Sequence, residues 1–133
     1  MIPRYRAWDK DFKTMYEADD IVYIDFEEKQ ICVKTLFFER ASRYDFNDIV
    51  LMQSTGLTDK NGKEIFEGDI ISIETDEENV KVEVSWDSKH ALFAFESKKY
   101  NEKLPLDELF EDNSYPFKII GNIWEDGELL DGV

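Results

Sequence analysis

Apart from its carboxylates, this chain of 133 residues has few side chains of the types that carry out catalysis or bind metals. The only histidine is His90 and the only cysteine is Cys32, whereas a zinc site needs several such ligands. No glycine-rich phosphate loop is present, and Ser54 lacks the flanking glycines of a nucleophile elbow. Cys32 lies between Ile31 and Val33, a pattern typical of a small buried hydrophobic residue, and His90 is interpreted as a turn residue. We therefore predict no catalytic residue, no metal site and no cofactor.

Carboxylates are the one abundant reactive group. The chain has 31 Asp and Glu against 16 Lys and Arg, which gives a formal net charge of −15. Residues 59–63 resemble part of a calcium loop, but their glycine stands at the fourth position where that loop needs it at the sixth, so a hairpin turn is favoured. With so many acids, counting does not identify an acid–base pair. A carboxylate-based enzyme stays an alternative, and it requires an Asp or Glu with a raised pKa in a cleft.

The negative charge is concentrated in two stretches of the chain. Residues 64–87 hold nine acids and one lysine, residues 107–131 hold eight acids and one lysine, and residues 1–16 carry +2. Direct binding to nucleic acid is not expected, because phosphate contacts need clustered cations. A solvated acidic surface is the favoured interpretation of the two stretches. The alternative is an acidic nucleic-acid mimic that occupies the basic groove of a DNA-binding protein and so inhibits it.

The sequence gives no indication of a membrane segment. No apolar run approaches the roughly 20 residues that a membrane helix needs, and residues 1–6 have no apolar stretch of signal-peptide type. We therefore expect a cytoplasmic protein that does not contact membranes.

Short β-rich runs bounded by polar turn residues dominate the chain and predict strands rather than long helices. Residues 21–26 and 31–37 flank a four-residue connection and are predicted to form a β-hairpin. Asn61 and Gly62 predict a second hairpin, because both residues tolerate the positive φ of a type I′ turn.

The later strands are predicted from alternating hydrophobicity. Residues 70–73 are predicted to form one strand, and residues 80–86 another. The polar face of the second strand, with Lys81, Glu83 and Ser85, is expected to be solvent-exposed. Residues 91–95 are apolar throughout and predict a strand that is covered on both faces. Residues 117–124 predict a final strand with a bulge or bend at Gly121.

One short helix is predicted near residues 105–112. Leu106, Leu109 and Phe110 follow Pro105 at helical spacing, and proline favours the first turn of a helix.

These elements predict an all-β fold with two lobes in one cooperative unit. Residues 1–50 form an N-terminal β-hairpin lobe, and residues 51–133 form a small SH3-like barrel or sandwich lobe. Aromatic residues make up 14% of the chain. Phe37 and Phe38, together with residues 93–95, have more apolar surface than one face of a small sheet buries. An interface between lobes, or in a homo-oligomer, is therefore an open alternative.

Four stretches of the chain resemble the YopX-like family of phage and prophage proteins: residues 6–10 with 15–16, residues 51–57, residues 59–70, and residues 120–125 with 129–130. The resemblance extends from residue 4 to residue 130, and residues 55–70 are its most specific part. It implies an all-β, two-lobed fold in a phage-derived protein of the host cytoplasm with no established biochemical activity. It carries over no catalytic or ligand residue.

The glycines and Asn61 in these stretches are interpreted as turn residues, and Asp69 is predicted to bind local backbone amides. The alternative is that Trp8, Gln53, Thr55 and Asn122 meet on one surface and bind a partner. Because the chain lacks a catalytic set and has surplus aromatic residues, we predict a non-enzymatic protein-interaction module whose protein partner is unknown.

Overall fold

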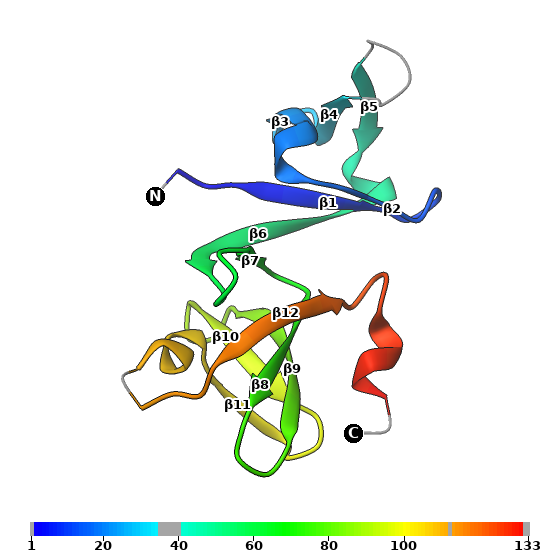
Figure 1. The fold of residues 1–133 in the computed structure, drawn as a ribbon. Coiled ribbons are helices and arrows are strands. Elements are labelled where there is room, and N and C mark those ends of the chain that lie inside the picture. The colour runs from blue at the N-terminus through cyan, green and yellow to red at the C-terminus, as the bar shows by residue number, and fades with distance from the viewer. Residues whose placement is uncertain (1, 35–40, 112, 132–133) are drawn as a thin grey trace. The chain divides into compact units, whose positions relative to one another are not determined.

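The computed structural model describes residues 2–34, 41–111 and 113–131. The predicted all-β class is confirmed, because every extended element is a strand and the helical segments are short 3-10 turns (Figure 1). The chain divides into two compact units, Met1–Ser54 and Thr55–Val133. The predicted boundary after residue 50 falls within the same strand, β6 (Ile49–Thr58), which runs from the first unit into the second.

The first unit contains two antiparallel arrangements of strands. Its elements are β1 (Tyr5–Asp9), β2 (Thr14–Tyr16), η1 (Ala18–Asp20), β3 (Ile21–Asp25), β4 (Gln30–Lys34), β5 (Ala41–Asp45), η2 (Phe46–Asp48) and the first residues of β6. Strand β1 pairs with β2 on one side and with β6 on the other, and β4 lies between β3 and β5.

The predicted N-terminal hairpin is formed by β3 and β4, and the predicted strand residues 35–37 lie outside the described chain, as does Phe38. Asp25 organises its turn, because its Oδ1 accepts the backbone amides of Glu27 and Glu28, each at 3.0 Å. Cys32, which is 5% exposed, lies on β4 beside the buried core residues Ile31 and Val33.

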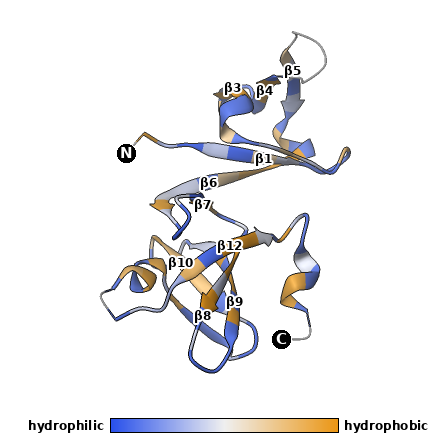
Figure 2. Ribbon diagram, viewed as in Figure 1, coloured by the Kyte–Doolittle hydropathy of each residue, from blue (hydrophilic) through white to orange (hydrophobic). Residues whose placement is uncertain are grey.

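The second unit is built on a five-stranded antiparallel sheet with the order β11-β10-β9-β8-β12. Its elements after β6 are β7 (Glu64–Phe66), β8 (Asp69–Glu74), β9 (Asn79–Asp87), β10 (Leu92–Ser97), β11 (Glu102–Pro105), η3 (Leu106–Phe110), β12 (Phe117–Asn122) and η4 (Gly127–Leu130). Figure 2 shows hydrophobic residues concentrated along β8 and β9. The buried core comprises Ile65, Ile71, Ile73, Val82, Val84, Phe95, Leu106, Leu109 and Phe117.

The predicted helix near residues 105–112 is the 3-10 segment η3, and residue 112 lies outside the described chain. Leu106 and Leu109 are buried, whereas Phe110 is 42% exposed. The predicted α-helical spacing was therefore wrong, because a 3-10 helix has three residues per turn and aligns Leu106 with Leu109 but not with Phe110.

The polar face of β9 is less exposed than its alternation predicts. Lys81, Glu83 and Ser85 are each half-buried, and η4 packs against β9 with Leu130 buried. The predicted solvent-exposed face is therefore only partly exposed. The sequence pattern also does not reveal that the C-terminal turn returns to this strand.

The hairpin turn at Asn61 and Gly62 also differs in type from the prediction. Only Gly62 has a positive φ, 78°, whereas a type I′ turn needs a positive φ at both central residues. The amide of Gly62 donates to the carbonyl of Asp59 at 3.0 Å, and the amide of Asp59 donates to the carbonyl of Lys63 at 2.9 Å. This pattern is a turn followed by a left-handed glycine, as in hairpins with a G1 bulge.

The irregularity predicted at Gly121 is confirmed, because the register of β12 on β8 shifts between Ile119 and Gly121. None of the helical segments in the described chain is long and apolar enough to span a membrane.

Candidate functional site

The four residues predicted to share an interaction surface are distributed between the two units. Trp8 and Gln53 lie on the paired strands β1 and β6, where Gln53 is opposite Tyr5 and Trp8 is opposite Val50. Trp8 is buried and Gln53 is half-buried. These two residues are therefore three positions apart along the ladder and are not direct partners.

Thr55 and Asn122 are buried in the second unit, where their polar atoms hold local backbone. The hydroxyl of Thr55 donates to the carbonyl of Ile65 at 2.8 Å. Oδ1 of Asn122 accepts the amides of Trp124 and Glu125 at 3.0 and 2.9 Å. A binding role for the four-residue set stays a prediction, and two of its members have structural hydrogen bonds.

Buried carboxylates organise several turns of the chain. Asp9, buried in the first unit, accepts the amides of Asp11 and Phe12 on Oδ1, each at 3.0 Å. The hydroxyl of Tyr16 donates to its Oδ2 at 2.6 Å. Burial and this hydrogen bond both raise the pKa of Tyr16 well above its usual range, so that the phenol stays protonated.

Asp59 joins its own turn to a strand far along the sequence. Its Oδ1 accepts the amides of Asn61 and Lys63 at 3.0 and 2.9 Å, and its Oδ2 accepts the amide of Ile119 on β12 at 2.9 Å. Burial alone would raise the pKa of Asp59, but these amides outweigh burial and hold the pKa below its ordinary value. The carboxylate is thus a structural anion.

The stretches at residues 59–70 and 120–130 contain two more such contacts. Oδ2 of Asp69 accepts the amide of Phe66 at 2.8 Å, which confirms the predicted local hydrogen bond. A Cβ on Gly121 would lie 2.4 Å from Oδ2 of Asp126, the atom that accepts the amide of Asn122 at 3.1 Å. A side chain at position 121 would therefore displace the side chain of Asp126 from this contact.

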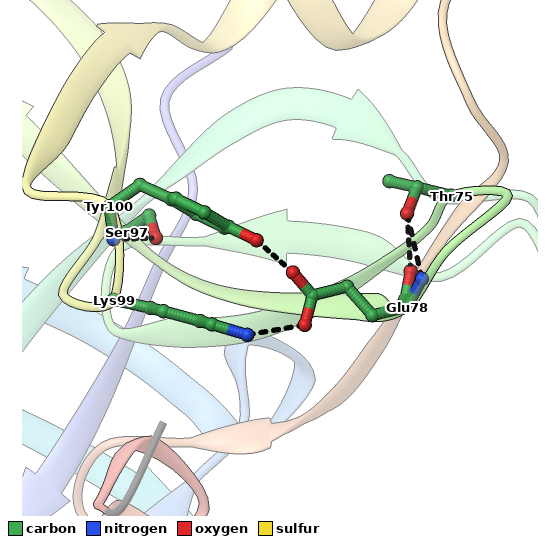
Figure 3. A network of polar contacts seen from close by, with 5 residues as sticks. All are labelled: Thr75, Glu78, Ser97, Lys99 and Tyr100. Atoms are coloured by element: carbon green, nitrogen blue, oxygen red, sulfur yellow. Dashed lines mark hydrogen bonds and ion pairs between the residues drawn. The ribbon is translucent and has the colours of Figure 1, made fainter.

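The acidic stretch that begins at residue 64 is largely engaged in internal contacts (Figure 3). Glu78 accepts hydrogen bonds from the hydroxyl of Tyr100 and the ammonium group of Lys99, both in the turn between β10 and β11. The turn between β8 and β9 is closed by Thr75, whose hydroxyl donates to the carbonyl of Glu78 at 2.6 Å. Glu74 pairs with Lys60 at 2.8 Å, and this contact lowers the pKa of Glu74.

Glu83 differs from these acids because its pKa is raised. Burial is the main cause, and the carboxylate of Glu96, directly opposite on β10, adds like-charge repulsion. Only Asp76 and Glu77 of the β8–β9 turn are exposed acids outside these contacts.

The two unique residues occupy the places that the sequence predicts. Cys32 is a free, buried thiol, and His90 lies in the turn between β9 and β10, where its Nδ1 is 2.7 Å from Oδ2 of Asp87. In the described chain no group of three or more His, Cys, Asp or Glu is placed to hold a metal ion.

One hollow of the second unit is formed around Trp86, and we call it the Trp86 groove. It has a volume of about 600 Å³, and its apolar part is formed by Leu57, Trp86, Leu92, Phe93 and Leu106. Trp86 continues the apolar face of β9 beyond the core and is 44% exposed. Its indole meets the ring of Phe93 edge to face, with centroids 5.0 Å apart. The groove therefore presents an accessible aromatic surface that is fixed by a second ring.

One side of the Trp86 groove is acidic. Asp107, Glu108 and Glu111 line it, all three are exposed, and no lysine or arginine contributes to the lining. Sequence reasoning placed Trp86 on the apolar face of the strand predicted over residues 80–86 and assigned these acids to a general acidic surface. Only the packing of η3 beside the end of β9 and β10 brings the two kinds of residue together.

Two smaller hollows lie elsewhere. One, in the first unit, has a volume of about 420 Å³ and is lined by aromatic and aliphatic residues that include Tyr5, Tyr23 and Phe26. The other, about 430 Å³, lies in the second unit between Lys60 and Tyr115. Glu83, the acid with the raised pKa, lines none of these three hollows.

These features define a small all-β protein of two units with structural carboxylates at its turns and an aromatic groove in the second unit. The model of the family described as YopX protein matches residues 4–131, so the chain belongs to the YopX family.

Two crystal structures share its fold. Protein EF1440 from Enterococcus faecalis is 27% identical, with a TM-score of 0.62, and the match covers 98% of this chain and 99% of that one. Protein YopX from Bacillus subtilis is 19% identical, with a TM-score of 0.65 and coverage of 96% and 98%. A search of curated proteins finds no match.

Proposed function

We propose that this chain is a non-enzymatic interaction module that binds a partner protein through the Trp86 groove. The observation that carries the proposal is the exposed indole of Trp86, fixed by Phe93 in an apolar hollow. Tryptophan is enriched among the residues that dominate binding energy at protein interfaces, and an anchored ring loses little entropy on binding. The resemblance to phage and prophage proteins extends the proposal to an origin in a phage or prophage.

The arrangement of reactive side chains supports a binding role over catalysis. Cys32 is buried, His90 is held by Asp87, and Glu83 lies away from the Trp86 groove. A carboxylate-based enzyme needs an acid with a raised pKa in the cleft that receives the substrate. The raised pKa of Glu83 is instead explained by burial and by its neighbour Glu96.

The contacts of the acidic turn favour this proposal over a nucleic-acid mimic. A mimic needs carboxylates that are free to replace phosphates along a ridge. Glu74 and Glu78 are held by Lys60 and by Lys99 with Tyr100, so the turn offers only Asp76 and Glu77.

The experiment that tests the proposal is selection of a random peptide library on the full chain, followed by measurement of each selected peptide's Kd for the variant Trp86→Ala. We expect peptides whose Kd rises about tenfold or more in Trp86→Ala, in line with the truncation of a hot-spot residue. Phe12→Ala is the matched control, because Phe12 is an exposed aromatic residue of the first unit.

Melting temperatures of both variants establish that they fold, and Trp86→Leu replaces Trp86→Ala if the contact with Phe93 proves essential for stability. Selected peptides that bind wild type and Trp86→Ala equally well would refute the proposal. Self-association that depends on Trp86, detected by sedimentation, would identify the partner as a second copy of the chain.

A further inference from the structure

We infer that the Trp86 groove selects a cationic segment of its partner and that an arginine of this segment stacks on Trp86 while it pairs with the acidic side of the groove. This inference rests on the proposed function and specifies the chemistry of the partner.

The first argument is the charge of the groove itself. Its lining holds the carboxylates of Asp107, Glu108 and Glu111 and no cation. Within the described chain, none of these three side chains takes part in an ion pair. Lys103, on the neighbouring strand β11, is directed to Asp87 at 3.8 Å. The carboxylates at the groove are therefore available to a ligand, in contrast to Glu74 and Glu78.

The second argument is the place of the carboxylates beside an aromatic ring. Arginine is planar, is more weakly hydrated than lysine, stacks on tryptophan and forms paired hydrogen bonds with carboxylates. Lysine forms the ion pairs but stacks less well, because its charge is compact and strongly hydrated. A hollow that offers an accessible indole and carboxylates together thus matches a guanidinium group better than an ammonium group.

The third argument is the electrostatic potential around the groove. The second unit, residues 55–133, has 20 acids and eight lysines, whereas the first unit has 11 acids and eight basic residues. The net charge is therefore −12 in the second unit and −3 in the first. A negative potential of this kind attracts a basic segment before contact, and its effect on the association rate falls as salt is added.

The test measures the binding of short labelled peptides to the full chain by fluorescence anisotropy at two salt concentrations. The reference peptide alternates arginine with leucine and serine. In matched peptides, lysine or the uncharged isostere citrulline replaces every arginine. We expect binding of the arginine peptide, a Kd several-fold higher for the lysine peptide, and a loss of about tenfold or more for the citrulline peptide.

Two triple variants separate local recognition from general attraction. Asp107→Asn, Glu108→Gln and Glu111→Gln neutralise the side of the groove. Asp76→Asn, Glu77→Gln and Glu102→Gln change the net charge equally at exposed positions outside the groove lining. The groove variant should weaken binding of the arginine peptide about tenfold, and the control variant should change it less than about twofold.

The outcomes distinguish this inference from the proposed function. Equal binding of the arginine and citrulline peptides, with loss of both in Trp86→Ala, would overturn the inference and leave the proposed function intact. Equal weakening by the two triple variants would also overturn it, because the attraction would then be non-specific. If no peptide binds in a manner that depends on Trp86, both proposals fail.

Discussion

Two hairpin turns of the second unit hold a carboxylate in opposite ways. In the turn between β6 and β7, Asp59 is buried and accepts three backbone amides, one of which belongs to Ile119 on β12. In the turn between β8 and β9, Glu78 binds the ends of two long side chains, Lys99 and Tyr100, at the surface (Figure 3).

The difference shows when a carboxylate determines a fold. Backbone amides are fixed by the strands, so a buried acceptor such as Asp59 sets the position of one element against another. Exposed ion pairs contribute little, because solvent screens them and the side chains lose entropy. The same functional group, a carboxylate, therefore has a structural role in one turn and a modest surface role in the other.

The largest expected effect is that of removing the Asp59 carboxylate. Asp59→Ala leaves the amides of Asn61, Lys63 and Ile119 without their acceptor, and we expect a loss of about 3 kcal/mol in unfolding free energy. Chemical denaturation of the full chain measures it. A loss below about 1 kcal/mol would contradict the structural role of this carboxylate.

The lowered pKa of Asp59 predicts its pH dependence. In the folded protein the carboxyl binds a proton less readily than in the unfolded chain, so its contribution is complete above about pH 4 and is lost as the pH falls further. The stability difference between wild type and Asp59→Asn should therefore shrink on acidification.

The second effect concerns the backbone of the same turn. Gly62 has φ of 78° and open space where a Cβ would stand, so any cost of substitution arises from backbone strain alone. We expect Gly62→Val to lose about 1 kcal/mol and Gly62→Asn to lose only a few tenths, because asparagine tolerates this conformation. Equal costs in denaturation experiments would show that φ is not the cause.

The smallest effect is expected at the other turn. Glu78→Gln removes the charge that faces Lys99, and the unfolding free energy should fall by about 0.5 kcal/mol or less at low salt. The loss should decrease as salt is added. A loss equal to that of Asp59→Ala would contradict the conclusion that the carboxylate of Glu78 contributes less to stability than that of Asp59.

Local sequence patterns predicted much of the fold. The hairpin of β3 and β4, the alternating strand β9 and the bulge at Gly121 follow from short-range hydrophobicity and turn chemistry. The role of Asp69 was also predicted, because its partner Phe66 is three residues away.

Long-range partners could not be predicted in the same way. The amide that Asp59 binds on Ile119 is 60 positions distant, and η4, which packs against β9, lies at the end of the chain. The Trp86 groove combines residues from β6, β9, β10 and η3, none of which carries a motif. The sequence indicated surplus aromatic residues and clustered acids but not that they meet.

The burial of Cys32 makes the first unit accessible to a simple chemical assay. Because this is the only thiol of the chain and it lies beside Ile31 and Val33 on β4, a thiol-specific reagent modifies it only after that strand opens. The modification rate of the unaltered protein therefore reports the opening equilibrium of β4, with no engineered label. The same measurement on Trp86→Ala shows whether a change at Trp86 alters the opening equilibrium of β4 in the first unit.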